Sequence, residues 1–438
     1  MLSRNGSCSK WVVAAWILSA VFSITGLAQG RSTTSSDRAR LDPLKEALGL
    51  SGSLRLGYWS ATRNLDGKRP IGSAMLWAKT KRDLSSRLSA YGEAWLASRG
   101  PVDRGEIRGE LREAYLNLKL DHLDVRAGRQ IFAWGRADAI NPTANLSGED
   151  LTLLTPDSED RKFGTTALRS RYFLPHSLSV SGIWLPEFRS TRFPFPDIGS
   201  GSSFIQDSPH WPANQFAVRL DKSGGAVDWS CSYFDGFDLL PDLSVANDSS
   251  VSEQIKVSHH RLRVIGADGA TNFGHYALRA EGAYAFTQNT SGQDPFVKEP
   301  YLFAIVGGDR TYGGELNINV QYIFRFVSEL PPTPSGEDGF ARRVAQEEAI
   351  IGSQTRGTQH GASARISDKW LHETLEAEIG IVGYFDPKGV LVRPKVTYSF
   401  TDHWKAIVGS EVYRGSNQSV FGLLRQNSVG YLEARFSF

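Results

Sequence analysis

Cysteine is nearly absent from this sequence, with only Cys8 and Cys231 among its 438 residues. Cys8 falls within a segment that we expect to be removed, so Cys231 would stand alone without a disulfide partner or a cysteine-ligated metal. The nine histidines are scattered, and only His259 and His260 are close together. Neither a zinc-ligand spacing nor a Gly-x-Ser-x-Gly elbow is present, so we expect no metal, no cofactor and no enzymatic activity.

Long apolar runs are also missing. After residue 28 the chain has no run of about 20 consecutive apolar residues, so no transmembrane helix is expected. Hydrophobic residues make up 40% of the chain, and the mean hydropathy is −0.29. Strands of a membrane β-barrel alternate apolar and polar residues, so a modest hydropathy is compatible with that class of protein.

The amino terminus has the features of a secretory signal peptide. Arg4 and Lys10 supply positive charge, residues 11–24 are apolar, and Gly26-Leu27-Ala28 is a small-x-small cleavage site. We predict a signal peptide over residues 1–28, with an uncleaved anchor helix as the alternative. Cleavage would lower Lys+Arg from 49 to 47 (49 − 2), equal to the 47 acidic residues. A neutral mature chain is not expected to bind nucleic acid.

Residues 29–50 are predicted to form a periplasmic lead-in. Asp42 is a helix N-cap, Pro43 suits the first helical position, and Gly49 lies past the end, so a short helix is expected. A packing role is favoured for this helix over a functional plug. Residues 51–438 are predicted to form the main domain.

The last ten residues, 429–438, alternate between an apolar and a polar face. Leu432, Phe436 and Phe438 belong to the apolar face. This segment resembles the closing strand of a bacterial outer-membrane β-barrel. The resemblance implies that Phe438 is a signal read by the barrel-assembly machinery.

The same alternation recurs along the chain, most cleanly over residues 315–324. The candidate strands are 51–60, 71–80, 84–98, 107–120, 122–131, 164–173, 177–186, 213–221, 226–235, 255–266, 273–286, 300–308, 313–327, 357–367, 370–385, 389–400, 404–414 and 425–438. Short connections alternate with mostly longer ones, as in bacterial barrels with periplasmic turns and long outer loops. We therefore predict an all-β, antiparallel up-and-down transmembrane barrel of eighteen strands, with sixteen as the alternative.

The most distinctive stretch covers residues 128–143, in which Gly-Arg-Gln is followed by Trp-Gly, Asp and Asn-Pro. It resembles the outer-membrane channel families related to alginate-export barrels, and is especially similar to their uncharacterised porin-like relatives. The likeness in motif extends from Glu113 to Trp184. For alginate export it implies an eighteen-stranded barrel with an arginine-lined tunnel. The tunnel residues have no one-to-one matches here, so the alginate substrate does not carry over.

This stretch opens a long connection, residues 132–163, that is too long and too charged for a plain connector. We expect it to fold into the lumen as a constriction, with an external capping loop as the alternative. The candidate constriction residues are Trp134, Arg136, Asp138, Asn141, Asp160 and Arg161.

Charged residues recur on the polar faces of the strands. The predicted lumen-lining residues are Arg126, Arg169, Arg171, Arg219, Arg261, Arg263, Arg279, Arg365, Arg393, Lys395, Glu376 and Glu378. Their basic excess favours anionic solutes. Charge pairing between neighbouring strands is the alternative, most plainly for the two glutamates.

The sequence thus predicts a porin-like channel of the bacterial outer membrane, for passage or export of small or polymeric anionic solutes. A lipid-acting barrel enzyme and a closed structural or assembly barrel are the alternatives. Expected partners are outer-membrane lipids and the assembly machinery, with a periplasmic or inner-membrane export complex as a further candidate.

Overall fold

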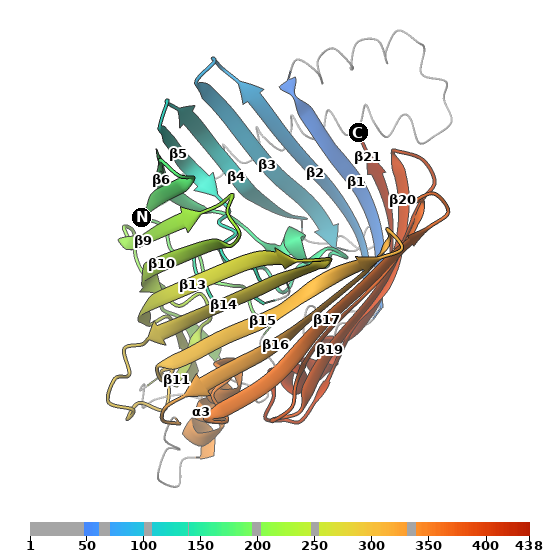
Figure 1. The fold of residues 1–438 in the computed structure, drawn as a ribbon. Coiled ribbons are helices and arrows are strands. Elements are labelled where there is room, and N and C mark those ends of the chain that lie inside the picture. Colours follow the sequence, from blue (N-terminus) through green and yellow to red (C-terminus); the bar gives the residue numbers. More distant parts are fainter. Residues whose placement is uncertain are drawn as a thin grey trace, which may run out of the picture. The chain divides into compact units, whose positions relative to one another are not determined.

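The computed structural model describes residues 48–60, 71–99, 107–138, 140–194, 203–246, 254–330 and 339–438. The predicted signal peptide and the short helix from Asp42 lie outside these residues, apart from the end of the lead-in. Residues 52–438 form one compact unit, whose main element is an eighteen-stranded antiparallel sheet (Figure 1). Its strands are β1 (Leu50–Trp59), β2 (Ile71–Asp83), β3 (Leu88–Arg99), β4 (Ile107–Lys119), β5 (Leu123–Gln130), β6 (Thr165–Leu174), β7 (Leu178–Leu185), β9 (Gln215–Lys222), β10 (Asp228–Phe237), β13 (Arg261–Phe273), β14 (Tyr276–Phe286), β15 (Tyr301–Tyr312), β16 (Leu316–Val327), β17 (Thr358–Trp370), β18 (Leu375–Tyr384), β19 (Gly389–Ser399), β20 (Trp404–Gly415) and β21 (Val429–Ser437).

The sheet closes on itself through its first and last strands. β1 pairs with β21 from Ser53 opposite Ser437 to Trp59 opposite Tyr431, and the two strands lie side by side in Figure 1. Phe438 adds two backbone hydrogen bonds, both of 3.0 Å, to Gly52. Closure leaves the sheet without an open edge. The prediction of an eighteen-stranded antiparallel barrel is confirmed.

The strands alternate between an outward apolar face and an inward polar face. On β16, Val320 and Tyr322 point outward and are 53% and 42% exposed, whereas Gln321 between them is 1% exposed. The same alternation places Leu432 outward on β21, as the sequence predicts. Within the described residues, no helix is both long and apolar enough to cross a membrane.

The largest difference from the predicted strand boundaries is at β13. The expected strand 255–266 divides into β12 (Gln254–Ser258), which lies outside the barrel, and β13, which starts at Arg261. The gap between the expected strands 255–266 and 273–286 predicts a turn that includes residues 268–270, but these residues continue β13, and the chain turns after Phe273. An Asp-Gly pair is a common turn signal. Here both residues pair with β14 instead, opposite Glu281 and Ala280.

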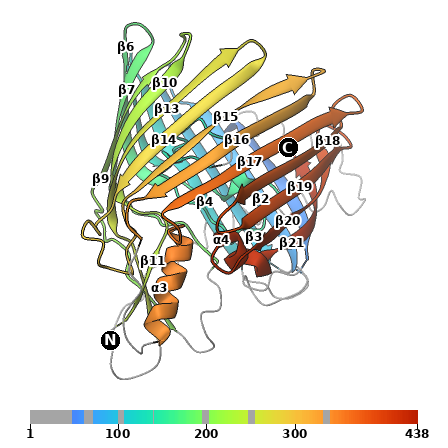
Figure 2. The same ribbon diagram turned by 60° about the horizontal axis from the view of Figure 1, so that its bottom comes forward.

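The long connections at one end of the barrel build a small additional structure, which we call the cap. It contains β12, β8 (Ser203–Gln206), β11 (Asp242–Val245) and the helix α3 (Gly339–Ile351). Figure 2 shows α3 beside β11. β12 lies between β8 and β11. The apolar core of the cap consists of Leu243, Ile255, Val257, Phe340, Val344 and Ile351.

Buried ion pairs and hydrogen bonds stabilise the cap. Lys298 donates to Asp238 at 2.7 Å, and Nδ1 of His260 lies 2.7 Å from Asp242. Burial alone would raise the pKa of Asp238, but the charges of Lys298 and His260 and the hydrogen bonds from Lys298 and Leu240 together outweigh burial and lower that pKa. Glu348 accepts the backbone N–H of Leu243. Burial, and then the neighbouring charge of Asp242, raise the pKa of Glu348 well above its ordinary value.

The closure of the barrel generates the first prediction. Deleting Phe438 removes both backbone hydrogen bonds to Gly52 and the ring that lies over this glycine, where a Cβ would be 2.8 Å from Cζ of Phe438. We expect a sharp fall in folded, heat-modifiable protein in outer membranes. Phe438→Ala keeps the backbone pairing and isolates the contribution of the ring. Wild-type levels after the deletion would contradict a role of this residue in closure.

Candidate functional site

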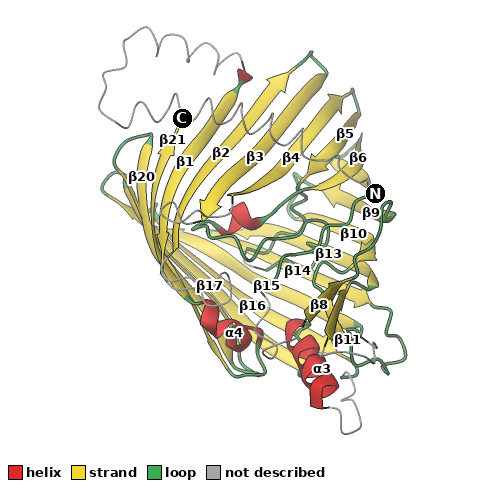
Figure 3. Ribbon diagram, turned by 180° about the vertical axis from the view of Figure 1, so that it is seen from behind, coloured by secondary structure: helices red, strands yellow, loops and turns green. Residues whose placement is uncertain are grey.

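The connection between β5 and β6, residues 131–164, runs along the inner side of the barrel, and we call it the inner loop (Figure 3). Its side chains and backbone bond to inward-facing residues of strands far apart in sequence. The strands contacted in this way are β1, β4, β13, β14, β16, β17, β19, β20 and β21. The loop is therefore held from several sides of the lumen.

Glu281 on β14 is the main acceptor for the first half of the inner loop. Its carboxylate accepts the backbone N–H groups of Arg136, Ala137 and Thr143 at 2.8, 3.1 and 2.8 Å, and the hydroxyl of Thr143 at 2.8 Å. Gly135 permits this turn because its φ is +94°. A Cβ at this position would lie 2.6 Å from the carboxylate oxygens, so a side chain does not fit.

Ion pairs reinforce this anchor. Nε of Arg136 lies 2.6 Å from Asp268 on β13, a carboxylate that also pairs with Arg219 on β9 at 3.0 Å. Asp138 lies 2.9 Å from Nε of Arg365 on β17. Each charge that the loop brings into the lumen here meets an opposite charge on the wall, as a partly buried charge requires.

The second half of the loop is bound on another side of the barrel. The short 3₁₀ helix η1 (Ser158–Arg161) and the residue before it carry the charges. Asp157 pairs with Arg435 at 2.9 Å and with Lys395 at 3.2 Å. Arg161 pairs with Glu411 at 2.8 Å, and Asp160 pairs with Arg55.

Apolar residues of the inner loop pack against the wall and explain one wrong prediction. Phe132, Trp134 and Leu146 form a buried cluster with inward residues that include Leu262 and Val264 of β13. Leu262 and Val264 face the loop, and side chains of a strand alternate between its two faces. Arg261, Arg263 and Ile265 therefore face outward, and Ile265 is 54% exposed. The expectation that Arg261 and Arg263 line the lumen is therefore wrong.

The other predicted lumen residues lie on the inner face, and most are paired. Arg279 pairs with Asp309 at 2.7 Å, Arg219 with Asp221 at 2.8 Å and Arg393 with Glu411 at 3.2 Å. Glu378 lies 3.5 Å from Lys395 and 3.7 Å from Arg365. Glu376 is opposite Thr397 on the same face. With its side-chain nitrogen oriented toward the carbonyl oxygen of Ala137, Asn141 donates to that oxygen at 2.6 Å within the inner loop.

Three arginines differ from the rest, and we call them the arginine cluster: Arg126 on β5 with Arg169 and Arg171 on β6. Arg126 and Arg169 are directly opposite each other in register. Arg126 donates to the Asn117 amide oxygen at 3.3 Å and Arg171 to the Ser179 hydroxyl at 3.0 Å. Nε of Arg169 is buried without a partner. Among the described residues, none of the three forms an ion pair with a carboxylate.

Sequence reasoning missed several wall residues that hold the inner loop. Arg112 on β4 donates to the backbone oxygens of Lys162 at 2.8 Å and Glu159 at 2.9 Å. Arg55 and Asp268 also serve as anchors. The Asp268-Gly269 pair predicts a turn and not a wall residue. The ion pair of Arg55 with Asp160 joins residues 105 positions apart in the sequence. Alternation gives the face on which such residues lie, but not the partners that they meet across the lumen.

Comparison with known proteins gives a family and a fold. A family profile described as "Protein of unknown function (DUF1302)" matches residues 58–301. No curated protein matches the sequence. Among solved structures, OccK11 (OpdR) of Pseudomonas aeruginosa is similar, with a TM-score of 0.51 and 12% identity over 89% of this chain and 94% of that chain. OccK5 (OpdH) of the same organism has a TM-score of 0.50 and 10% identity, covering 89% and 96%.

A mutant of Rh. blastica porin also aligns, with a TM-score of 0.41 and 13% identity over 89% of this chain and 99% of that chain. The similarity to the two Pseudomonas aeruginosa structures, at 10–12% identity, shows a common barrel fold. These matches do not show a kinship with alginate-export barrels.

The anchoring of the inner loop generates the second prediction. Glu281→Ala would leave three N–H groups of the loop without their acceptor, that of Thr143 buried and those of Arg136 and Ala137 part-buried, at up to about 1–3 kcal/mol each. We expect the first half of the loop to detach and trypsin to cleave after Arg136 at least about tenfold faster in the refolded protein. Glu376→Ala is the control, because this inward carboxylate accepts no hydrogen bond from a described residue of the loop. Equal cleavage rates in wild type and Glu281→Ala would show that Glu281 does not hold the loop.

Proposed function

This chain belongs to the DUF1302 family, whose profile covers more than half of its length, and we propose that it is an outer-membrane channel for small anionic solutes. In this proposal the inner loop narrows the lumen, and the arginine cluster draws anions into the passage that remains. The observation that carries the proposal is the arginine cluster, an unpaired positive charge on the inner wall.

The outward face of the barrel supports a membrane location. Large apolar side chains are exposed on this face along most strands, which in water would be unfavourable over so wide an area. Aromatic residues lie outward near the short turns and again near the long connections, as in the two aromatic girdles of outer-membrane barrels. These residues include Tyr172, Trp229, Tyr276, Tyr312, Trp370, Trp404, Trp184, Tyr284, Phe286 and Phe326.

The inner wall supports selectivity for anions. Most inward arginines form ion pairs with carboxylates of the wall or of the inner loop, whereas the hydrogen-bond and ring partners of the arginine cluster are amide, hydroxyl and aromatic groups. The carboxylate of Asp124 lies on the strand position opposite Arg171 but forms no ion pair with the cluster, so three guanidinium groups stand beside one carboxylate. A solute anion would supply the missing negative charge. At an effective dielectric of about 20, a unit charge about 4 Å away contributes roughly 4 kcal/mol before desolvation is subtracted. Salt should weaken this preference, because the Debye length is only about 8 Å at physiological ionic strength.

A closed structural barrel is the second candidate. The many ion pairs and hydrogen bonds that fix the inner loop favour it, because a loop held from several sides could also seal the lumen. The two candidates differ in whether the refolded barrel conducts ions across a planar bilayer.

The third prediction concerns this passage. Deleting residues 144–156 should raise single-channel conductance, because it removes part of the inner loop. Replacing Arg169 and Arg171 with Ser should shift the reversal potential in a KCl gradient toward that of cations, because it removes two unpaired positive charges.

The matched control is the double variant Arg279→Gln/Asp309→Asn, which removes a neutral inward pair and should leave selectivity unchanged. If the Arg169/Arg171 variant and this control behave alike, the arginine cluster does not set selectivity. If the deletion leaves conductance unchanged, the inner loop is not the constriction.

The fourth prediction concerns orientation. The short turns should face the periplasm and the long connections the cell exterior. A protease site inserted beside Trp211, which is 65% exposed in the connection before β9, should be cleaved on intact cells. A site inserted at Ser223–Gly224, in the turn between β9 and β10, should be protected. The opposite pattern would reverse the assignment of the two ends.

A further inference from the structure

The outward face of β13–β16 combines an apolar groove with two arginines, Arg261 and Arg263, at the long-connection end of β13. We propose that this surface binds one phosphorylated, acylated glycolipid of the outer leaflet, with its phosphate on the arginines and an acyl chain in the groove. The inference rests on the membrane location proposed above and is independent of whether the barrel conducts.

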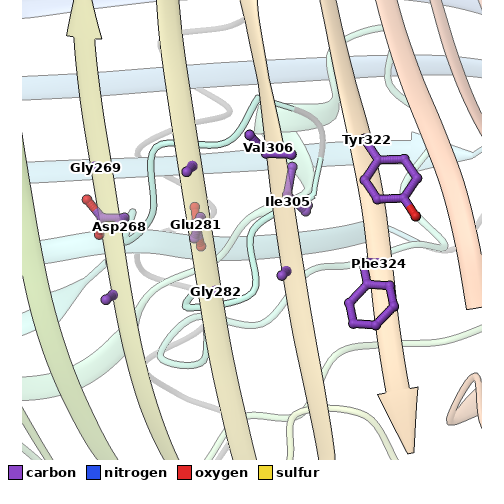
Figure 4. Close-up of a pocket in the computed structure, with 11 residues that line it drawn as sticks. Asp268, Gly269, Glu281, Gly282, Ile305, Val306, Tyr322 and Phe324 are labelled. Atoms are coloured by element: carbon purple, nitrogen blue, oxygen red, sulfur yellow. The ribbon is translucent and has the colours of Figure 1, made fainter. Parts of the chain in front are cut away.

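The groove has a volume of about 530 Å³. Small residues of three neighbouring strands form its floor: Ala267, Gly269, Ala280, Gly282 and Ala304. Val306, Tyr322 and Phe324 form one side. Figure 4 shows Val306 on the strand next to Gly282, and Tyr322 and Phe324 on the following strand. The register places Ala267 opposite Gly282, and Gly282 opposite Ala304, so the missing side chains create one continuous hollow.

The two arginines carry more charge than their partner neutralises. Arg261 and Arg263 share a single carboxylate, Asp235, at 2.6 and 3.4 Å. The side chain of Arg263 is 65% exposed. Two guanidinium groups and one carboxylate leave a net positive charge on the outward face, where a phosphate is a suitable partner because guanidinium groups bind it through two parallel N–H donors.

The surroundings place this charge at the edge of an apolar belt. Ile265 follows Arg263 on the outward face and is 54% exposed, and Phe286, opposite Arg263, is 46% exposed. Arginines in such a position extend toward lipid headgroups while their neighbours contact acyl chains.

The distance between charge and groove suits one lipid molecule. Ala267, at the near end of the groove, is four residues beyond Arg263, or about 13 Å at about 3.3 Å per residue. A long acyl chain that descends from a headgroup at the arginines would pass Ile265 and enter the groove. A second copy of the chain would fill the groove but would leave the positive charge unexplained.

The fifth prediction tests this site by titrating the detergent-purified full-length protein with lipid A, detected by native mass spectrometry. The variant Arg261→Gln/Arg263→Gln should bind roughly 10- to 30-fold more weakly, because each arginine near a lipid headgroup contributes about 1 kcal/mol. Gly282→Leu should weaken binding by about tenfold or more, because it fills the groove. A Cβ at Gly282 meets its nearest atoms only at 3.8 Å, so this variant is expected to fold.

Arg310→Gln is the matched control. Arg310 is also outward but lies near the short turns, where it bonds to Tyr276, so this variant should bind lipid A as wild type does. Dephosphorylated lipid A should bind as weakly as the double arginine variant, and inorganic phosphate alone should not displace lipid A.

Wild-type affinity in the double arginine variant would overturn the proposal, as would displacement of the lipid by inorganic phosphate alone. A change of oligomeric state in Gly282→Leu, with lipid A binding unchanged, would assign the groove to contact between two copies and also overturn it. Channel conductance in a planar bilayer is a separate measurement, so failure of lipid binding leaves the channel proposal intact.

Discussion

Backbone hydrogen bonding is the constraint on which the rest of this structure depends. A sheet in a membrane has no water to satisfy an open edge, so its first and last strands must pair. The pairing of β1 with β21 meets this requirement, and Phe438 extends it through Gly52. A closed barrel of eighteen strands has a lumen that is too wide for the side chains of the wall alone to fill.

The inner loop occupies part of this lumen. It brings both charges and aromatic rings into the lumen, and residues of the wall bind each of them. Carboxylates such as Glu281 meet its N–H groups, basic residues such as Lys395 meet its acids, and Leu262 meets its aromatic residues. The arginine cluster is the part of the inner wall whose guanidinium groups form no ion pair with a described carboxylate, and for this reason the proposed function rests on it.

Much of the barrel follows from local pattern. Period-two alternation gave the eighteen strands and, for most of them, the face of each residue. It failed at β13, where Asp268-Gly269 imitates a turn and where the inward positions are apolar because the loop covers them. The partners of the inner loop could not be predicted, because the bond between Arg136 and Glu281 joins positions 145 apart and depends on the register of every strand between them. The cap was missed for the same reason, since β8 and β12 pair across a long connection.

The most direct test of the central claim is the current carried by single wild-type barrels in a planar bilayer under a KCl gradient. The proposed function predicts a steady conductance whose reversal potential lies on the anion side and moves toward zero as the total salt concentration rises. A barrel that inserts and folds but carries no current, or a reversal potential on the cation side, would contradict the account.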